Sequence, residues 1–479
     1  MERTSPINDH RSSLTGHRIT FNGIDVTSGE YLTPPVDADD FARIVLDRPP
    51  EGVEDLRWRL FAKEEKAALR DAHDPKNLKE AGWAILFAED ADPRIEQALE
   101  PLISLRRKQV DNEGRFRILR GEQGFRDSDN KIRFLKRAGV TPAGPVDPDA
   151  MPYYILMVGS PSRIPFEFQY QLDVAYAVGR LHFDDVSSYR HYADSVVAVE
   201  DKQRDKVRTG LFGTAHPNDE ATQRSAEDLV SALATAIRER APEVAVDHRA
   251  PESATKAALA DLLGNSASPR LAFTATHGLG TPVGHSDQQA LQGALVCQDW
   301  PGPGNSIGSS HYFAASDVDP SADYSGLIAF LFACYGAGTP QFDDFSGPDE
   351  GQPRTLANAP FVGALPKALL GHESGAALAV VGHVDRAWTY SFDWPEVGPQ
   401  TAIFEDTLFR LFAGYPIGYA MEMFNERHAE LAVDLHDSEG LVGTADQLTS
   451  DEVAGLWTAK NDSRNYALLG DPAVRLVDA

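Results

Sequence analysis

The chain has 479 residues, enough for two or three domains, or for one large α/β domain with an N-terminal companion. Its 45 basic and 72 acidic residues give a formal charge of −27. This argues against nucleic acid or an anionic membrane as a partner, because both select for clusters of Lys and Arg. Two cysteines are too few for a disulfide framework, and no Cys/His spacing is typical of a metal site. We expect neither a metal nor another cofactor.

Residues 1–20 lack the apolar core of a signal peptide, and no apolar run reaches the length of a membrane span. We therefore expect a cytoplasmic protein with free thiols.

The N-terminal part reads as a polar leading segment followed by α/β structure. Residues 1–35 are polar and predicted to be loop-like, and a helical pattern follows between residues 37 and 72. A buried strand, an amphipathic helix and a second strand are then predicted at 82–90, 92–110 and 115–121. The Pro- and Gly-rich residues 138–152 are predicted to be a loop before the next unit.

Apolar strands and amphipathic helices alternate through the rest of the chain. The strands are predicted at 153–159, 207–215, 270–278, 326–336 and 375–384, and the helices at 184–203, 225–241 and 402–414. This alternation predicts an α/β fold with a parallel-rich sheet flanked by helices on both faces. Two polar insertions, 281–325 and 339–360, are predicted to be surface loops.

Two of these strands end in residues capable of nucleophilic catalysis. "ATHG" places His277 before Gly278, and "FACYG" places Cys334 close before Gly336. The carboxyl ends of parallel strands meet at one sheet edge, where an imidazole could take the proton of a thiol. The backbone amides of Gly278 and Cys334 could then bind an oxyanion. Cys297, in "ALVCQDW", has no such surroundings and is predicted to be structural.

These motifs resemble those of caspase-like cysteine peptidases, the group that includes caspases, gingipains and CHAT proteases, and most of all the gingipain-like branch. "YYILMVGSPSRIP" followed by "YAVGRLHFDD" is similar to the first subdomain of that branch, "ALAVVGHVDRAW" to the strand after the cysteine, and "NYALLGDPAVRL" to the closing strand. Together these matches run from about residue 153 to 476. The resemblance implies a caspase-hemoglobinase-like fold with two subdomains.

On this basis we expect three parts. Residues 1–150 form an N-terminal α/β region, either regulatory or an extension of the first subdomain. Residues 151–205 form the gingipain-like first subdomain, and residues 206–479 the caspase-like catalytic subdomain.

The resemblance implies His277 as general base and acid, Cys334 as nucleophile, and Trp388 as a wall of the specificity pocket. Gingipains carry an acidic residue near the catalytic histidine, where this chain has "HPND" with His216, so a third catalytic residue stays open. The longer connection from His277 to Cys334 contains "DWPGPG", which is interpreted as a lid or an exosite.

The charge of the specificity pocket is also left open. In "PNDEATQRSAEDL", Asp219 or Glu220 would select Arg or Lys, whereas Arg224 would select Asp or Glu. All three also suit a solvated helix N-terminus. The resemblance to gingipains slightly favours a basic substrate residue.

We therefore predict a cysteine endopeptidase that acts on polypeptides, with a protein activator or regulator as a further partner. Two alternatives remain. One is a catalytically silent interaction scaffold on the same fold, and the other is a thiol hydrolase or acyltransferase that acts on small molecules. Cleavage and thiol labelling distinguish the three.

Overall fold

The computed structural model describes residues 18–19, 23–32, 36–37, 69, 73–142, 144–200, 207–264, 270–345, 354–394, 397–439 and 449–476. The helical pattern expected between residues 37 and 72 lies almost entirely outside these ranges.

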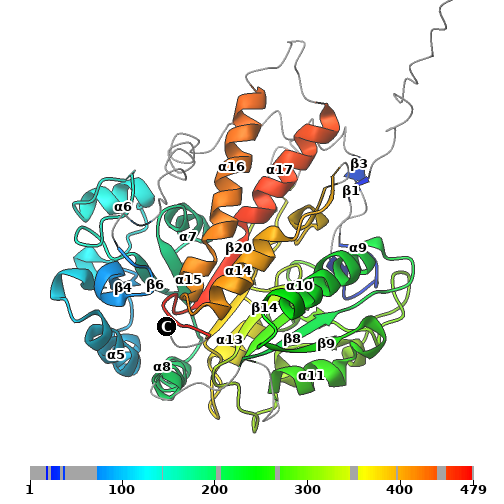
Figure 1. Cartoon of the computed structure of the whole chain (residues 1–479), viewed down its shortest axis with the longest axis horizontal. Coiled ribbons are helices and arrows are strands. Elements are labelled where there is room, and N and C mark those ends of the chain that lie inside the picture. Colours follow the sequence, from blue (N-terminus) through cyan, green and yellow to red (C-terminus); the bar gives the residue numbers. More distant parts are fainter. Residues whose placement is uncertain are drawn as a thin grey trace, which may run out of the picture.

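A ten-stranded sheet forms the centre of the molecule (Figure 1). Its strands, in spatial order, are β5 (Phe116–Leu119), β4 (Trp83–Phe87), β6 (Tyr154–Val158), β7 (Ala177–Leu181), β20 (Tyr466–Gly470), β17 (Ala379–His383), β14 (Ile328–Phe332), β10 (Leu271–Ala275), β8 (Arg208–Gly213) and β9 (Ala245–Arg249). Neighbouring strands are parallel except β17 and β20, which are antiparallel. The sheet therefore consists of two parallel halves that run in opposite directions.

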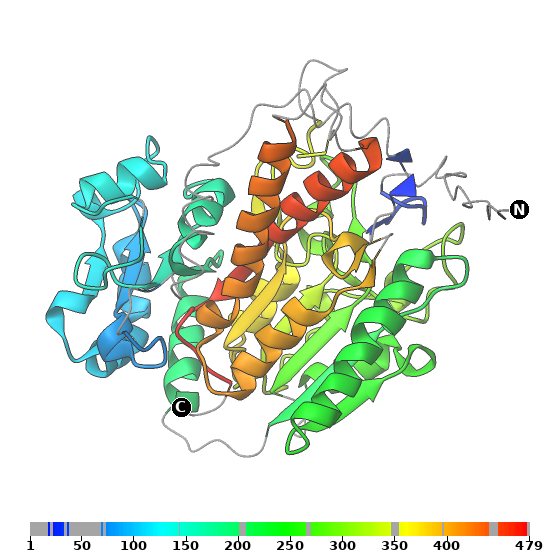
Figure 2. The same ribbon diagram turned by 45° about the horizontal axis from the view of Figure 1, so that its top comes forward.

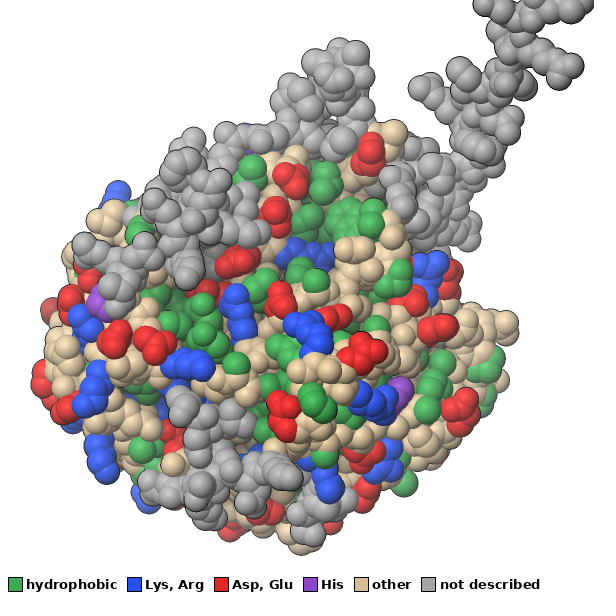
Figure 3. All heavy atoms as spheres, in the orientation of Figure 1, with side chains coloured by type: hydrophobic (Ala, Val, Ile, Leu, Met, Phe, Trp, Pro, Cys, Tyr) green, Lys and Arg blue, Asp and Glu red, His purple; other side chains and the backbone are tan. Residues whose placement is uncertain are grey.

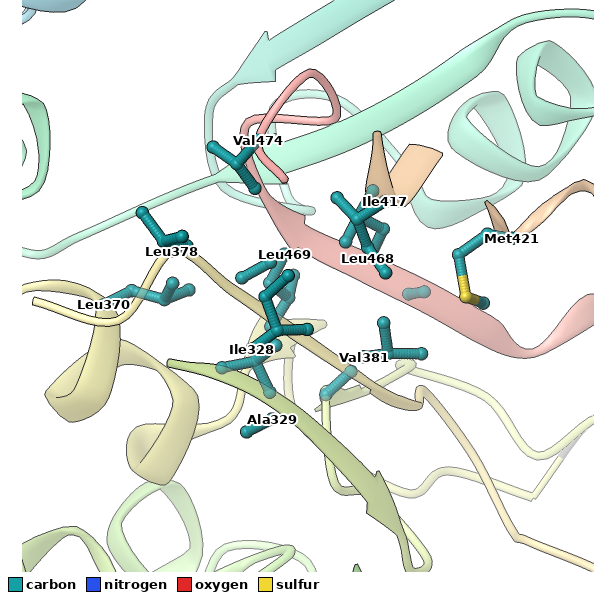
Figure 4. Close-up of a cluster of buried hydrophobic side chains, with 14 of the residues drawn as sticks. Ile328, Ala329, Leu370, Leu378, Val381, Ile417, Met421, Leu468, Leu469 and Val474 are labelled. Carbon is teal, nitrogen blue, oxygen red and sulfur yellow. The ribbon is translucent and has the colours of Figure 1, made fainter. Parts of the chain in front are cut away.

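The central strands are buried along their whole length because helices cover the sheet. Strands β14, β17 and β20 are buried at every residue. Ile328, Val381 and Leu468 from these strands lie in one apolar cluster with Ile417 and Met421, which belong to the short helix α15 (Ile417–Ala420) and its C-cap (Figure 4). Continuous apolar runs such as "IAFLF" are typical of strands with both faces covered. The predicted α/β fold with a parallel-rich sheet is confirmed.

The helices flank the sheet, and the pair α16 and α17 lies side by side (Figure 2). They are α3 (Leu78–Ala81), α4 (Pro93–Ala98), α5 (Glu100–Val110), α6 (Lys131–Arg137), α7 (Phe166–Asp173), α8 (Val186–Glu200), α9 (Glu220–Arg224), α10 (Ala232–Arg240), α11 (Lys256–Gly264), α12 (Gln288–Leu291), α13 (Ala364–Leu370), α14 (Ala402–Phe412), α15 (Ile417–Ala420), α16 (Glu422–Glu439) and α17 (Ser450–Arg464). A π-helical segment, Ser225–Ser231, joins α9 to α10. None of the described helices is both long and apolar enough to cross a membrane.

The N-terminal region contributes to the same sheet. β4 and β5 continue the half that begins with β6 and β7. Asp471, just after β20, accepts hydrogen bonds from Trp83 Nε1 at 3.0 Å and from Arg106 Nε at 2.7 Å, so the closing strand is tied to this region. The role of residues 1–150, regulatory or an extension of the first subdomain, stays a prediction. The boundaries at 150 and 205 stay predictions.

A second, four-stranded sheet lies at the edge of the catalytic half. It consists of β13 (Tyr312–Phe313), β12 (Leu295–Val296), β11 (Gly278–Gly280) and β2 (Gly23–Asp25). The prediction of a surface loop for 281–325 is therefore wrong in part: Trp300 is buried in an apolar cluster with Ile24 and Leu279, and Phe313 is buried in the main core. The prediction of a loop for residues 1–35 is also wrong for β2.

On the face shown in Figure 3, acidic and basic side chains of the described residues are interspersed, and they do not gather into a continuous basic area.

Candidate active site

The two predicted catalytic residues follow neighbouring strands by the same offset. β10 and β14 are parallel, with Ala275 opposite Phe332, and His277 and Cys334 each come two residues later. Gly278 lies directly against the Cys334 backbone, since a Cβ on this glycine would be 1.9 Å from the Cys334 carbonyl oxygen. The structure therefore brings the histidine and cysteine segments together at one edge of the sheet.

A left-handed turn follows the cysteine. Tyr335 has φ of 59°, which is uncommon for a residue other than glycine. Its amide donates to the carbonyl oxygen of Asp385 at 2.8 Å, in the loop after β17. Backbone strain of this kind is concentrated at functional sites, where the surrounding structure holds it in place. The turn therefore fixes the course of the backbone directly after Cys334.

The thiol itself is shielded from solvent. Cys334 is 0% exposed, and the amide of Ala387 donates to its Sγ at 3.3 Å. Burial raises the pKa of the Cys334 thiol to about 12, although the Ala387 hydrogen bond acts in the opposite direction. Because the thiolate is the nucleophile, this raised pKa disfavours reaction of the shielded cysteine at neutral pH.

Asp219 holds one nitrogen of His277. Nε2 of the imidazole lies 2.5 Å from Oδ2 of Asp219, and both side chains are completely buried. Burial would raise the pKa of Asp219, but the charge and hydrogen bond of His277 outweigh it and lower the pKa to about 2. Within the described part of the chain, Nδ1 of His277 has no hydrogen-bond partner. The imidazole is thus oriented through one nitrogen, and the other is left to exchange a proton.

Local sequence explains why Asp219 is in this place. It is the N-cap of α9, and its side chain accepts a weak hydrogen bond, 3.5 Å long, from the amide of Thr222. The helix therefore begins at Glu220, five residues before the predicted start at 225. Asp219 was considered for the specificity pocket or for a solvated helix start. The solvated helix start is wrong, because the carboxylate is buried against His277 and also accepts a hydrogen bond from Tyr31. A pocket role for Asp219 stays a prediction.

His216 does not take the place of the acidic residue. Its Nδ1 lies 2.9 Å from the carbonyl oxygen of Trp300, and its ring is stacked on that of His277 with centroids 6.3 Å apart. Burial and the neighbouring His277 lower the pKa of His216 to about 4, so this imidazole is neutral at physiological pH. Trp300, in the insertion interpreted as a lid or exosite, therefore packs on the site.

The remaining pocket candidates are already engaged with other side chains. Arg224 forms ion pairs with Glu220 and with Asp393. Trp388 is completely buried, and its ring packs on Phe345 with centroids 4.7 Å apart. The pocket roles of Glu220, Arg224 and Trp388 stay predictions.

One buried carboxyl near the thiol is only partly hydrogen-bonded: Oδ1 of Asp385 accepts a hydrogen bond from the amide of Arg386 at 2.8 Å. Asp385 is 1% exposed and, among the described residues, its Oδ2 has no hydrogen-bond partner. Burial raises the pKa of Asp385 to about 8, against the opposing effect of Arg386. The sequence analysis missed this carboxyl, although "VDRAW" lies within the quoted "ALAVVGHVDRAW". Among the described residues, no group of three or more His, Cys, Asp or Glu is arranged to hold a metal ion.

The chain is similar to known peptidases. A family model described as Peptidase family C25 matches residues 126–477. A solved structure titled "Structure of Protease" shares 14% identity, with 85% of this chain and 80% of that chain covered and a TM-score of 0.47. The complex of the pro- and mature domains of RgpB from Porphyromonas gingivalis shares 11% identity, with coverages of 82% and 79% and a TM-score of 0.41.

A third similar structure is the separase–securin complex of Saccharomyces cerevisiae. It shares 10% identity, with 80% of this chain and 20% of that chain covered and a TM-score of 0.32. No curated protein was found to be similar to the chain.

Proposed function

Since the chain belongs to peptidase family C25 and is a cysteine-type peptidase, we propose that it hydrolyses peptide bonds with Cys334 as nucleophile and His277 as general base and acid. The observation that carries this assignment is the common edge at which both residues follow parallel strands, with the imidazole held by Asp219.

The geometry supports a two-step reaction once the site is open. Nδ1 of His277 takes the thiol proton, and the sulfur of Cys334 bonds to the substrate carbonyl carbon. The amides of Gly278 and Cys334 stabilise the resulting oxyanion. The imidazolium then protonates the leaving amine, and the C–N bond breaks. Water hydrolyses the thioester, which releases the acid and restores the thiol.

In this scheme Asp219 is a positioning residue. Its carboxylate contacts His277 and does not reach the reacting bond. It fixes the orientation of the ring and stabilises the imidazolium that forms during the reaction.

We further propose that the substrate carries Arg or Lys at the cleaved position. Asp385 supports this preference, because a buried carboxyl with an unpaired oxygen is costly until a cation reaches it. It lies two residues before Ala387, whose amide contacts the thiol. The charge of Arg224, the candidate for an acidic preference, is already balanced by Glu220 and Asp393.

The peptidase assignment is tested with a mixed peptide library, incubated for days and analysed by mass spectrometry. Because the thiol is shielded, we expect slow cutting by the wild type and by Cys297→Ala, and none by Cys334→Ala. Cuts that persist in Cys334→Ala would contradict the assignment. A silent scaffold would label at Cys334 in its opened form without cutting any peptide.

The proposed preference for Arg or Lys at the cleaved position is tested with fluorogenic peptides that end in Arg, Lys, Asp or Gln. We expect cleavage after Arg or Lys, and a loss of about 10²-fold in kcat/KM for these peptides in Asp385→Asn, since a buried ion pair with the substrate is removed. Asp319→Asn, which alters an exposed carboxylate, is the matched control. Cleavage only after Asp would refute the basic preference. A cytoplasmic location and a protein activator stay predictions.

A further inference from the structure

A segment from the N-terminal part of the chain lies on the candidate active site. Strand β2 pairs in parallel with β11, the strand that begins at Gly278, with Gly23 opposite Gly278 and Asp25 opposite Gly280. The amide of Val26 adds a hydrogen bond of 2.9 Å to the carbonyl oxygen of Gly280. Residues 23–32 are hereafter the N-terminal hairpin. It appears in dark blue beside α9 in Figure 1.

The hairpin contacts each of the three groups of the site. The α-carbon of Gly23 approaches the thiol so closely that a Cβ there would be 3.2 Å from Cys334 Sγ. The hydroxyl of Tyr31 donates to Oδ1 of Asp219 at 2.9 Å. The ring of Tyr31 meets the His277 ring edge to face, with centroids 5.9 Å apart.

The hairpin is anchored by apolar contacts and close backbone packing. Ile24 is completely buried in a cluster with Leu279, Val296 and Trp300. Gly29 lies against the insertion, where a Cβ would be 2.0 Å from the carbonyl oxygen of Asn305. The tip of the hairpin, at Thr27 and Ser28, is exposed.

These contacts explain why the thiol is shielded, and they identify what a substrate must replace. An extended polypeptide can bind an exposed edge of a β-sheet by adding a strand to it. β12 occupies one side of β11 and β2 occupies the other, so β2 takes the edge next to Gly278. A substrate whose carbonyl reached Cys334 would meet Gly23 and Tyr31 first.

We propose that the N-terminal hairpin is a built-in plug that keeps the peptidase latent, and that it leaves the β11 edge when the enzyme is activated. The role of the hairpin in latency rests on the proposed function, whereas the contacts by which it covers the site do not. The insertion 281–325 serves as the receptor for the plug, through β12, Trp300 and Asn305. Activation then requires that the three residues of β2 separate from β11 and that Ile24 leaves its apolar cluster.

The experiment is thiol labelling of the full chain with iodoacetamide, analysed peptide by peptide. The two cysteines report different events: Cys334 reports displacement of the plug, and Cys297, which is buried in the main core and not in the apolar cluster of Ile24, reports global unfolding. Ile24→Asp places a charge in the anchoring cluster, and we expect it to speed labelling of Cys334 by about tenfold or more without affecting Cys297, as in local opening. Thr27→Asp, at the exposed tip, is the matched control and should label like the wild type.

Equal labelling of Cys334 in the wild type and in Ile24→Asp would overturn the proposal. If Cys297 also labels rapidly, the variant has unfolded, and Gly23→Cys is the second test. The short approach of residue 23 to Cys334 predicts that mild oxidation links these two positions by a disulfide. Failure to form this link in the folded protein would also overturn the proposal.

The same variants separate the plug from the peptidase. Faster labelling of Cys334 together with new peptide cleavage supports both. Faster labelling without any cleavage supports the plug and refutes the proposed function. Full cleavage activity in the wild type, unchanged by Ile24→Asp, refutes the plug and leaves the proposed function intact.

Discussion

Asp219 and His277 form a completely buried pair in which Oδ2 of the carboxylate lies 2.5 Å from Nε2 of the imidazole. They are 58 residues apart in the chain and come from different elements. The pair leaves Nδ1 as the nitrogen that can receive the thiol proton.

Asp219→Asn should lower kcat with little change in KM, because the amide no longer stabilises the imidazolium. We expect a loss of about 10²- to 10⁴-fold, the range typical when the carboxylate that orients a catalytic histidine is removed. The assay is peptide hydrolysis on an Ile24→Asp background, so that the site is open. Glu227→Gln, an exposed change in the same helical segment, should keep full activity. A KM effect alone would show that Asp219 serves substrate binding.

The reactivity of Cys334 should depend steeply on pH. Its raised pKa, about 12, means that alkylation of the wild type should increase about tenfold per pH unit from 7 to 10 without levelling off. Iodoacetamide labelling followed by mass spectrometry measures this rate. In Ile24→Asp, where solvent reaches the thiol, the rate should level off at lower pH. A plateau near pH 8 in the wild type would mean that the thiol is not shielded.

Gly278→Ala should damage the site through steric conflict. The new Cβ would be 1.9 Å from the carbonyl oxygen of Cys334, and backbone atoms on both sides resist displacement. We expect a loss of roughly 1–3 kcal/mol in the free energy of unfolding, as for other overpacked sites, together with loss of activity. Denaturant unfolding measures the first effect. Gly308→Ala, where a Cβ meets nothing within 4 Å, should leave stability and activity unchanged.

Asp385→Asn should stabilise the protein more at high pH than at low pH. The pKa of Asp385 is raised from 3.8 to about 8, so its stabilising contribution is fully present below pH 3.8 and is lost as pH rises to about 8. Replacing the carboxyl removes this loss. Thermal unfolding should therefore show a Tm gain that grows between pH 5 and pH 8. A gain that shrinks with pH would show that the carboxylate is paired.

Much of the site is determined by the sequence itself. The strands that lead to His277 and Cys334 are largely apolar, and a glycine closes each motif. Strands of this kind are buried in parallel sheets, and their carboxyl ends meet at one edge, so the sequence alone predicts that the two residues lie together. The order of family-like motifs along the chain likewise predicted the caspase-like fold and the peptidase class.

The partners of these residues depended on the tertiary structure. The hydroxyl of Tyr31 reaches Asp219 across 188 positions, and β2 is a strand of only three residues within a polar stretch. A strand so short shows no periodicity, and its pairing arises from contacts with β11 and the insertion. The same reason explains why the sequence does not predict the pairing of Asp219 with His277. Sequence patterns record which residues are buried or exposed in regular elements, whereas contacts between distant segments are decided only when the chain folds.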